Sequence, residues 1–168
     1  MSVSVSWEEF VAKHAQAVLD SALRVVAIPA DAEDVAQEVF LEIFRNKKLS
    51  EFADQPALLR TMATRRALDR LRQRKPTCEL DGRELDAHGH DPSEYAIAAE
   101  LDRRLRDGLA GLPAREAEVF CLVTLEGCSV SEIAELLNMS NGAVTKSLCK
   151  ARGRLSATLG IVRSEVKR

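Results

Sequence analysis

The chain has 168 residues, of which 30% are charged and 46% are hydrophobic, enough for one soluble domain or two small ones. No apolar run approaches the roughly 20 residues of a membrane-spanning helix, and the N-terminus lacks the basic start and apolar core of a signal peptide. We therefore expect a cytoplasmic protein with no membrane insertion.

Composition and charge indicate the fold class and the kind of partner. Aromatic residues make up only 4% of the chain, and the helix formers Ala, Leu, Glu and Arg dominate, so we expect an all-α protein. The net charge of −2 hides an uneven distribution, with −3 over residues 1–50, +4 over 51–76, −5 over 77–110 and +2 over 111–168. Such alternation predicts basic, DNA-facing patches separated by acidic surfaces for other partners.

Two helices are predicted before residue 47. Apolar residues keep a helical period from Trp7 to Val26, and Pro29 with Asp31 ends this helix and caps the next, which runs from Asp31 to Asn46. The second helix carries an acidic stripe at four-residue spacing, formed by Asp34, Glu38 and Glu42 and flanked by Gln37. Taken alone, such a stripe is more often a solvated face than a docking surface for a basic partner.

A third helix is predicted from Pro56, which suits a first helical position, to about Arg74. It carries a basic stripe formed by Arg66, Arg70 and Arg74, with Arg65 and Arg72 beside it. Solubility alone can produce such a stripe. Its density, in a chain that ends in a second basic helix, favours contact with nucleic acid.

The segment from Thr77 to Ser93 is predicted to be a linker, because it contains Pro, Gly, Asp and two His and has no apolar period. A metal site made by Cys78, His88 and His90 is conceivable, but this spacing fits no standard zinc pattern. We therefore expect no metal and no cofactor, and we expect the four cysteines to be free thiols. A fourth helix follows from about Glu94 to Gly108.

The last third of the chain has the pattern of a helix-turn-helix. Ser129 and Glu132 form a capping-box pattern that starts a short helix near Val130. Asn138 tolerates the left-handed conformation of a helix end, and Ser140 is a fair N-cap for the final helix. In this motif the second helix enters the major groove of DNA.

The outer face of the final helix is polar and basic. Its candidate DNA-contacting residues are Thr145, Lys146, Cys149, Lys150 and Arg152. The charges from Leu136 onward are basic except for Glu165, whereas those between Gly111 and Glu135 are acidic except for Arg115. This switch favours DNA contact over an ordinary helical hairpin with a solvated face.

Three segments together resemble the sigma-70 family of bacterial RNA polymerase sigma factors, in particular the small extracytoplasmic-function (ECF) type. DAEDVAQEVF from Asp31 is similar to the polymerase-binding motif, and TMATRRALDRLRQRK from Thr61 to the helix that recognises the −10 promoter element. The segment around Leu112-Pro113, Glu132-Ile133-Ala134 and Gly142 is similar to the −35 reader. The segments occur in the family's order and spacing.

The resemblance implies an N-terminal domain over residues 1–76, a flexible linker over 77–93 and a C-terminal helix-turn-helix domain over 94–168. It implies a protein that is not an enzyme and that directs core RNA polymerase to promoters. The polymerase contacts would come from Asp31, Asp34, Gln37, Glu38 and Glu42, which would bind the β′ clamp helices. The −10 contacts would come from Arg65, Arg66, Arg70, Arg72 and Arg74, and the −35 contacts from the outer face of the final helix.

The resemblance also implies contact with the β flap of the polymerase, with promoter DNA and with an anti-sigma factor. It further implies that the loop 50–56 holds an unstacked base. Two rival functions remain open on the sequence. One is a stand-alone helix-turn-helix transcriptional regulator, which would bind duplex DNA specifically without polymerase. The other is a thiol- or metal-based sensor that uses Cys78, His88, His90 and the helix cysteines.

Overall fold

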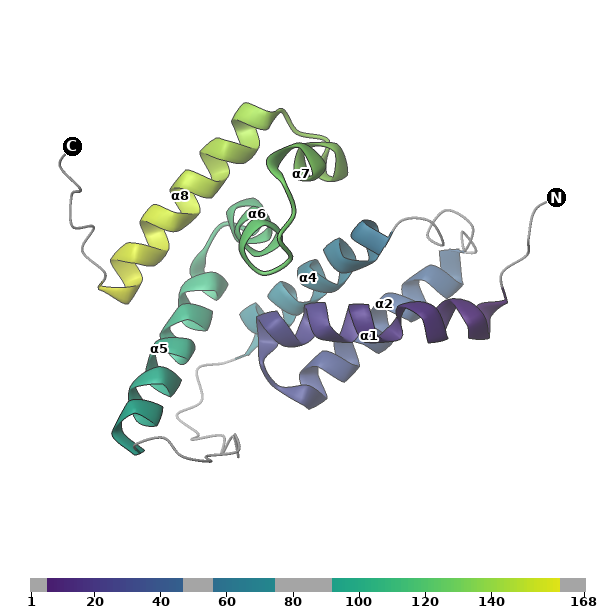
Figure 1. Cartoon of the computed structure of the whole chain (residues 1–168), viewed down its shortest axis with the longest axis horizontal. Helices are drawn as coiled ribbons and strands as arrows, with labels where there is room; N and C mark the ends of the chain where they lie inside the picture. The colour runs from purple at the N-terminus through teal and green to yellow at the C-terminus, as the bar shows by residue number, and fades with distance from the viewer. Residues whose placement is uncertain (1–5, 47–55, 75–91, 161–168) are drawn as a thin grey trace.

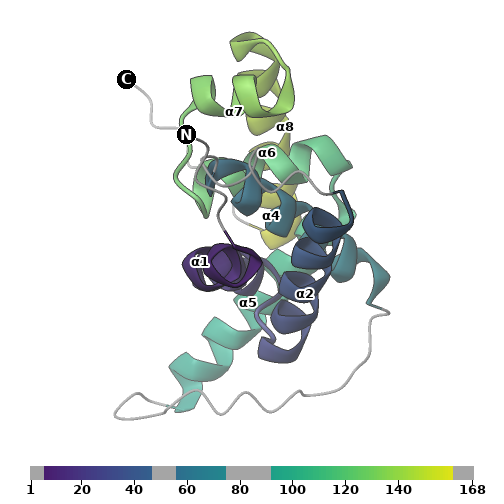
Figure 2. The same cartoon turned by 90° about the vertical axis from the view of Figure 1, so that its right-hand side faces the viewer.

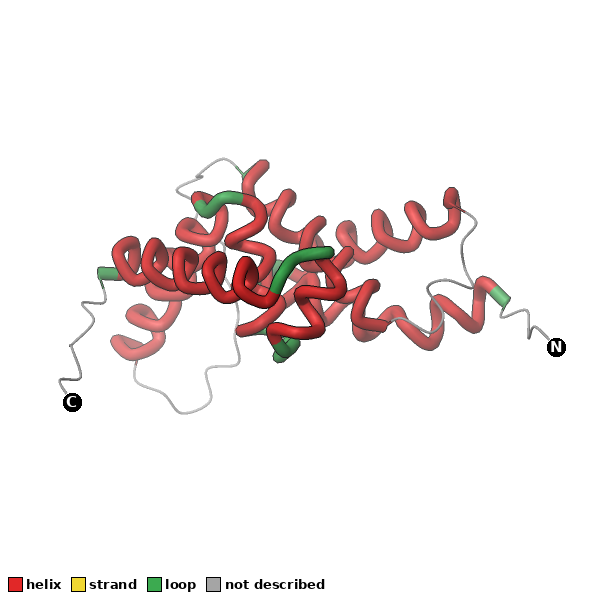
Figure 3. The backbone as a smooth tube through the Cα atoms, turned by 90° about the horizontal axis from the view of Figure 1, so that it is seen from above, coloured by secondary structure: helices red, strands yellow, loops and turns green. Residues whose placement is uncertain are grey.

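The structure is a computed structural model, and it describes residues 6–46, 56–74 and 92–160. Within these ranges the regular structure is helical and contains no strand (Figures 1 and 3), which confirms the all-α prediction. The helices are α1 (Trp7–Val26), α2 (Pro29–Asn46), α4 (Pro56–Gln73), α5 (Pro92–Gly111), α6 (Ala114–Thr124), α7 (Val130–Leu137) and α8 (Asn141–Leu159).

Helices α1, α2 and α4 pack on one another around a buried apolar cluster. The cluster contains Phe10, Val18, Val39, Ile43, Leu59 and Ala63. Trp7 covers its edge, with its ring centroid 5.9 Å from that of Phe10 and 5.0 Å from that of Phe44. This three-helix unit fixes the outer faces of α2 and α4, which carry the predicted acidic and basic stripes.

The start of α2 differs from the prediction. The helix begins at Pro29, two residues before Asp31, and Ala27 ends α1 with a left-handed φ of 60°. Proline suits the first turn of a helix because its fixed φ is helical and the amide hydrogen it lacks would have no partner there. The residue interpreted as a helix end therefore starts the next helix.

The predicted helix-turn-helix is present. Ser129 and Glu132 form the capping box of α7, with the Ser129 amide donating to the Glu132 carboxylate at 2.7 Å. Asn138 ends α7 in the left-handed conformation, with a φ of 51°, and the Ser140 hydroxyl accepts from the Ala143 amide at the start of α8. Local capping chemistry therefore sets the turn that presents α8.

Helix α5 extends beyond its predicted bounds, and Gly108 continues the helix instead of ending it. Gly108 is buried, and a Cβ at this position would lie 2.9 Å from the Cδ2 atom of Leu155. The glycine therefore permits the close packing of α5 on α8. Its role is in packing between helices and not in capping.

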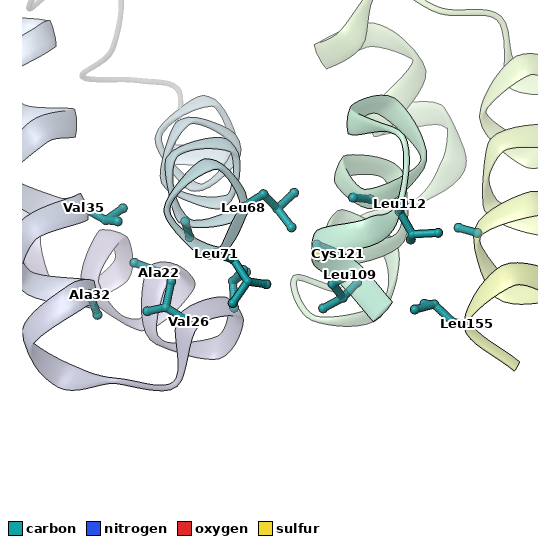
Figure 4. Packing of buried hydrophobic residues seen from close by; sticks show 14 residues of the cluster. Ala22, Val26, Ala32, Val35, Leu68, Leu71, Leu109, Leu112, Cys121 and Leu155 are labelled. Atoms are coloured by element: carbon teal, nitrogen blue, oxygen red, sulfur yellow. The ribbon is translucent and has the colours of Figure 1, made fainter. Parts of the chain in front are cut away.

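The two halves of the chain share a buried core, which the sequence analysis did not predict. Figure 4 shows Leu68 and Leu71 of α4 facing Leu109 and Cys121 across the boundary, and these residues belong to one apolar cluster. Helix α4 lies between α1 and α2 on one side and α5 and α6 on the other (Figures 1 and 2). The predicted linker falls mostly outside the described residues, so its flexibility stays a prediction.

Candidate polymerase and promoter interface

The acidic stripe of α2 and the basic stripe of α4 lie against each other. Arg66 donates to Glu42 at 2.8 Å. Arg70 pairs with Asp31 at 3.2 Å and also with Asp34. Arg74 lies 3.6 Å from Asp31. The sequence predicted these stripes as separate surfaces for separate partners, whereas the fold brings them together in one network of ion pairs.

The ion pairs raise the pKa of two α4 guanidinium groups, which are charged near neutral pH with or without them. The hydrogen bond to Glu42 raises the pKa of Arg66, and the hydrogen bond to Asp31 raises the pKa of Arg70. Because these side chains are half-buried or exposed, each pair is of modest strength and is screened by salt. A competing polyanion such as DNA can therefore exchange with the carboxylates of α2.

The remaining part of the acidic stripe is exposed in the described structure. Gln37 and Glu38 are exposed, and no described basic residue forms an ion pair with Glu38. Two large apolar side chains lie close by in sequence: Leu41 is 49% exposed and Phe44 57% exposed. An open groove between α2 and α4 is lined by Glu38, Leu41, Glu42, Arg45, Asn46 and Arg66.

Leu41 and Phe44 were not predicted from the sequence as candidate contact residues. A signal for them was present, because both lie off the apolar period of Val35, Val39 and Ile43 that faces the core. Contiguous exposed apolar side chains with polar residues around them mark protein–protein contact sites more strongly than single ones do. The candidate surface on α2 is therefore amphipathic and not purely acidic.

The other two predicted −10 arginines lie elsewhere on α4. Arg65 pairs with Glu118 of α6, a residue of the second half of the chain. Arg72 pairs with Asp69 at 3.1 Å on its own helix. Each of the five predicted −10 arginines thus has a carboxylate partner within the protein.

The outer face of α8 is exposed as predicted. Val144, Leu148 and Ala151 are buried, whereas Lys146, Cys149, Lys150 and Arg152 are exposed. Within the described residues, no acidic side chain forms an ion pair with Lys146, Lys150 or Arg152. Thr145 is exposed too, but its hydroxyl donates to the Asn141 carbonyl at 2.9 Å. This basic face is available to an anionic partner.

The cysteines of the described chain do not form a reactive cluster. Burial raises the pKa of Cys121 to about 12 and also raises the pKa of the half-buried Cys128, so both thiols are protonated near neutral pH. No group of three or more His, Cys, Asp or Glu residues in the described ranges is arranged to hold a metal ion. Cys78, His88 and His90, residues 50–55 of the predicted loop and most of the linker lie outside the described residues.

None of the described helices is both long enough and apolar enough to cross a membrane.

Comparison with protein families places both halves of the chain. Residues 10–77 match the model of sigma-70 region 2, and residues 102–155 match the model of sigma-70 region 4. These ranges contain the α2–α4 stripes and the helix-turn-helix respectively. The two family matches thus cover both of the surfaces described above.

Relatives of known function agree with these matches. The chain is 30% identical over 165 residues to the RNA polymerase sigma factor CarQ of Myxococcus xanthus, covering 97% of this chain and 94% of CarQ. It is 32% identical over 124 residues to the ferric citrate uptake sigma factor FecI of Escherichia coli, covering 72% of each chain. It is 28% identical to the ECF sigma factor SigE of Mycolicibacterium smegmatis, covering 89% of this chain and 60% of SigE.

Among solved structures, the chain is similar to CnrH in complex with the cytosolic domain of CnrY, with a TM-score of 0.56 and 25% identity over 92% of this chain and 87% of that one. The chain belongs to the sigma-70 family of RNA polymerase sigma factors, within the ECF type. This membership confirms the resemblance seen in the three sequence segments and does not favour the stand-alone regulator.

Proposed function

We propose that the chain recruits core RNA polymerase to promoters through four surfaces and acts without a catalytic site of its own. The main observation behind this proposal is the basic outer face of α8, which lacks acidic partners among the described residues. This face lies in a segment that matches sigma-70 region 4. A helix-turn-helix presents its second helix to the major groove. The proposed role of this face is to read the −35 element.

The polymerase contact is proposed for α2. Glu38 and Gln37 supply polar groups that suit a basic partner, and Leu41 and Phe44 supply apolar area. An interface with an apolar centre and a charged rim binds better than a charged face alone, because exposed ion pairs are weak. The proposed partner of this surface is the β′ clamp helices of the polymerase.

The −10 contact is proposed for the arginines of α4. Guanidinium groups bind phosphate through charge-assisted hydrogen bonds and hold the DNA strand without reading its sequence. The sequence predicted a polymerase-binding role for Asp31, Asp34 and Glu42. This proposal gives them another role, because their carboxylates already pair with arginines of α4. In this proposal they orient the arginines, and Glu38 carries more of the polymerase contact.

We propose two further contacts, one with the β flap of the polymerase and one with an anti-sigma factor. Ile97 and Leu101 of α5 are 69% and 49% exposed, and this apolar face is the proposed contact for the β flap. The neighbour CnrH was solved bound to the cytosolic domain of CnrY. By that similarity we propose that an anti-sigma factor also holds this chain, in the cytoplasm.

The proposal is tested by co-purification with core polymerase followed by run-off transcription from a promoter library. The expected result is a stoichiometric complex and transcripts that begin at a defined distance from a shared pair of promoter elements. A chain that fails to bind core polymerase, or that leaves transcript starts unchanged, contradicts the proposal.

A further inference from the structure

Thr145 lies in the first part of α8, on its exposed side. The helix begins at Asn141, and Thr145 follows one turn later, next to the buried Val144. In a helix-turn-helix, the residues that contact base edges lie in the N-terminal part of the second helix. Thr145 is therefore placed for contact with bases, nearer the helix start than Lys150 or Arg152.

The hydroxyl group of Thr145 is already engaged within the helix. It donates to the Asn141 carbonyl at 2.9 Å. This hydrogen bond turns the hydroxyl back toward the preceding turn, as is common for threonine in helices. The methyl group of the side chain extends away from the bond. The surface that an incoming molecule meets at Thr145 is therefore largely apolar.

The residues next to Thr145 on the outer face are small. Gly142 lies one turn before it and Cys149 one turn after it, and both are exposed. A Cβ added at Gly142 would meet nothing within 4 Å, and this glycine does not have a positive φ. Neither packing nor backbone geometry in the described chain requires a glycine there. The helix surface is low beside Thr145, so a base edge can approach its short side chain closely.

One base presents a matching group in the major groove. Thymine carries a C5-methyl group there, and apolar contact with this group, including contact by a threonine methyl, is a recurrent way of reading thymine. The donor of the Thr145 hydroxyl is bonded to Asn141, so it does not serve the acceptor atoms of a purine. The geometry of Thr145 therefore favours thymine.

We propose that Thr145 reads a thymine of the −35 element through its methyl group. This rests on the proposed function, because it assigns a base preference to the α8 face that is proposed to read the −35 element. Lys146 and Lys150 on the same face suit guanine, since their amino groups donate to its O6 and N7 atoms. Thr145 adds a preference for the base that offers a methyl group.

Two substitutions of similar size separate the methyl group from the hydroxyl. Thr145→Val keeps a methyl group and removes the hydroxyl, whereas Thr145→Ser keeps the hydroxyl and removes the methyl group. Thr158→Ser is the matched control. The Thr158 hydroxyl makes the same kind of bond, to the Arg154 carbonyl at 3.0 Å, but its side chain lies toward Gly108 of α5. Each full-length variant is assembled with core polymerase and transcribes a promoter library.

A change in the DNA tests the same contact from the other side. Deoxyuridine lacks only the C5-methyl group of thymidine, so it replaces the thymine that the wild type selects, and a mobility-shift assay compares the two promoter duplexes for each polymerase complex. Deoxyuridine should weaken binding by wild type and Thr145→Val about fourfold, as expected when one methyl group loses its apolar contact. It should leave binding by Thr145→Ser unchanged.

In the library, wild type, Thr145→Val and Thr158→Ser should select thymine at one −35 position, and Thr145→Ser should accept other bases there. Loss of this preference in Thr145→Val overturns the proposal, because the hydroxyl would then read the base. Retention of the preference in Thr145→Ser also overturns it, and so does a wild-type affinity that deoxyuridine leaves unchanged. These results leave the proposed function intact, whereas a wild-type complex without any −35 preference contradicts both.

Discussion

Glu38 differs from its neighbours on the acidic stripe of α2. Asp34 and Glu42 pair with arginines of α4, whereas Glu38 is exposed and no described cation forms an ion pair with it. A substitution at Glu38 therefore changes an intermolecular contact with little effect on the fold. A substitution at Asp34 changes the intermolecular contact and also removes an ion pair with Arg70 inside the fold.

We predict that Glu38→Lys weakens binding to core polymerase at least tenfold, equivalent to about 1.4 kcal/mol. The reason is that a repulsive charge replaces an attractive one at the proposed contact. Glu8→Lys, at an exposed position of α1 away from this surface of α2, should leave the affinity within about twofold of wild type. Surface plasmon resonance with immobilised core enzyme measures both, and equal affinities for the two variants would remove the assignment.

The basic residues of α8 should divide into two kinds. Lys146→Ala and Lys150→Ala should each cost roughly 1–3 kcal/mol and relax the base preference at one position, as expected for side chains that reach base edges. Arg152→Ala should weaken all sequences alike and reduce the salt slope by about one, as expected for a phosphate contact. A promoter library transcribed by each variant separates the two behaviours, and an unchanged −35 preference in both lysine variants means that α8 does not read bases.

At the scale of elements, the helix-turn-helix was the most predictable part of the chain. Ser129, Asn138 and Ser140 act within a few residues of their own positions, so their capping roles can be inferred without the fold. Gly108 could not be interpreted in this way. Its role depends on Leu155, which is distant in sequence, and the isolated signal of a glycine near a helix end favoured termination.

Two helical glycines provide a matched pair for stability measurements. Gly153 of α8 is exposed, and a Cβ there would meet nothing within 4 Å, so Gly153→Ala should stabilise the fold by about 0.5–1 kcal/mol through helix propensity. Gly108→Ala gains the same propensity but places its Cβ against Leu155, so it should give no net gain or a loss. Chemical denaturation measures both. An equal gain in the two variants would show that α5 and α8 do not pack closely in solution.

The thiols should react in an order set by burial. Cys149 is exposed on α8, whereas Cys121 is buried in the shared core and its pKa is raised to about 12. In a Cys78→Ser background, a thiol reagent at pH 8 should modify Cys149 first and leave Cys121 unmodified until the chain unfolds, because the thiolate is the reactive form. Rapid native modification of Cys121 would mean that the shared core opens readily.

At the scale of the whole molecule, the sequence predicted both regions but not the relation between them. Periodicity and capping are local, so they located the α2 and α4 stripes and the α8 face. The pairing of Arg65 with Glu118 joins residues 53 positions apart, and no local pattern contains it. For the same reason, the arginines of α4 were expected to be free for DNA, whereas in the structure they pair with carboxylates of the same chain.

We expect this chain to recognise promoters only as part of a polymerase complex. The most direct measurement is the affinity for one promoter duplex with and without core polymerase, at physiological salt and by the same mobility-shift assay. We predict weak binding by the free chain and tight, sequence-specific binding by the complex, lost when Lys146 and Lys150 are changed to alanine. Nanomolar, sequence-specific binding by the free chain would contradict it and would indicate a stand-alone regulator.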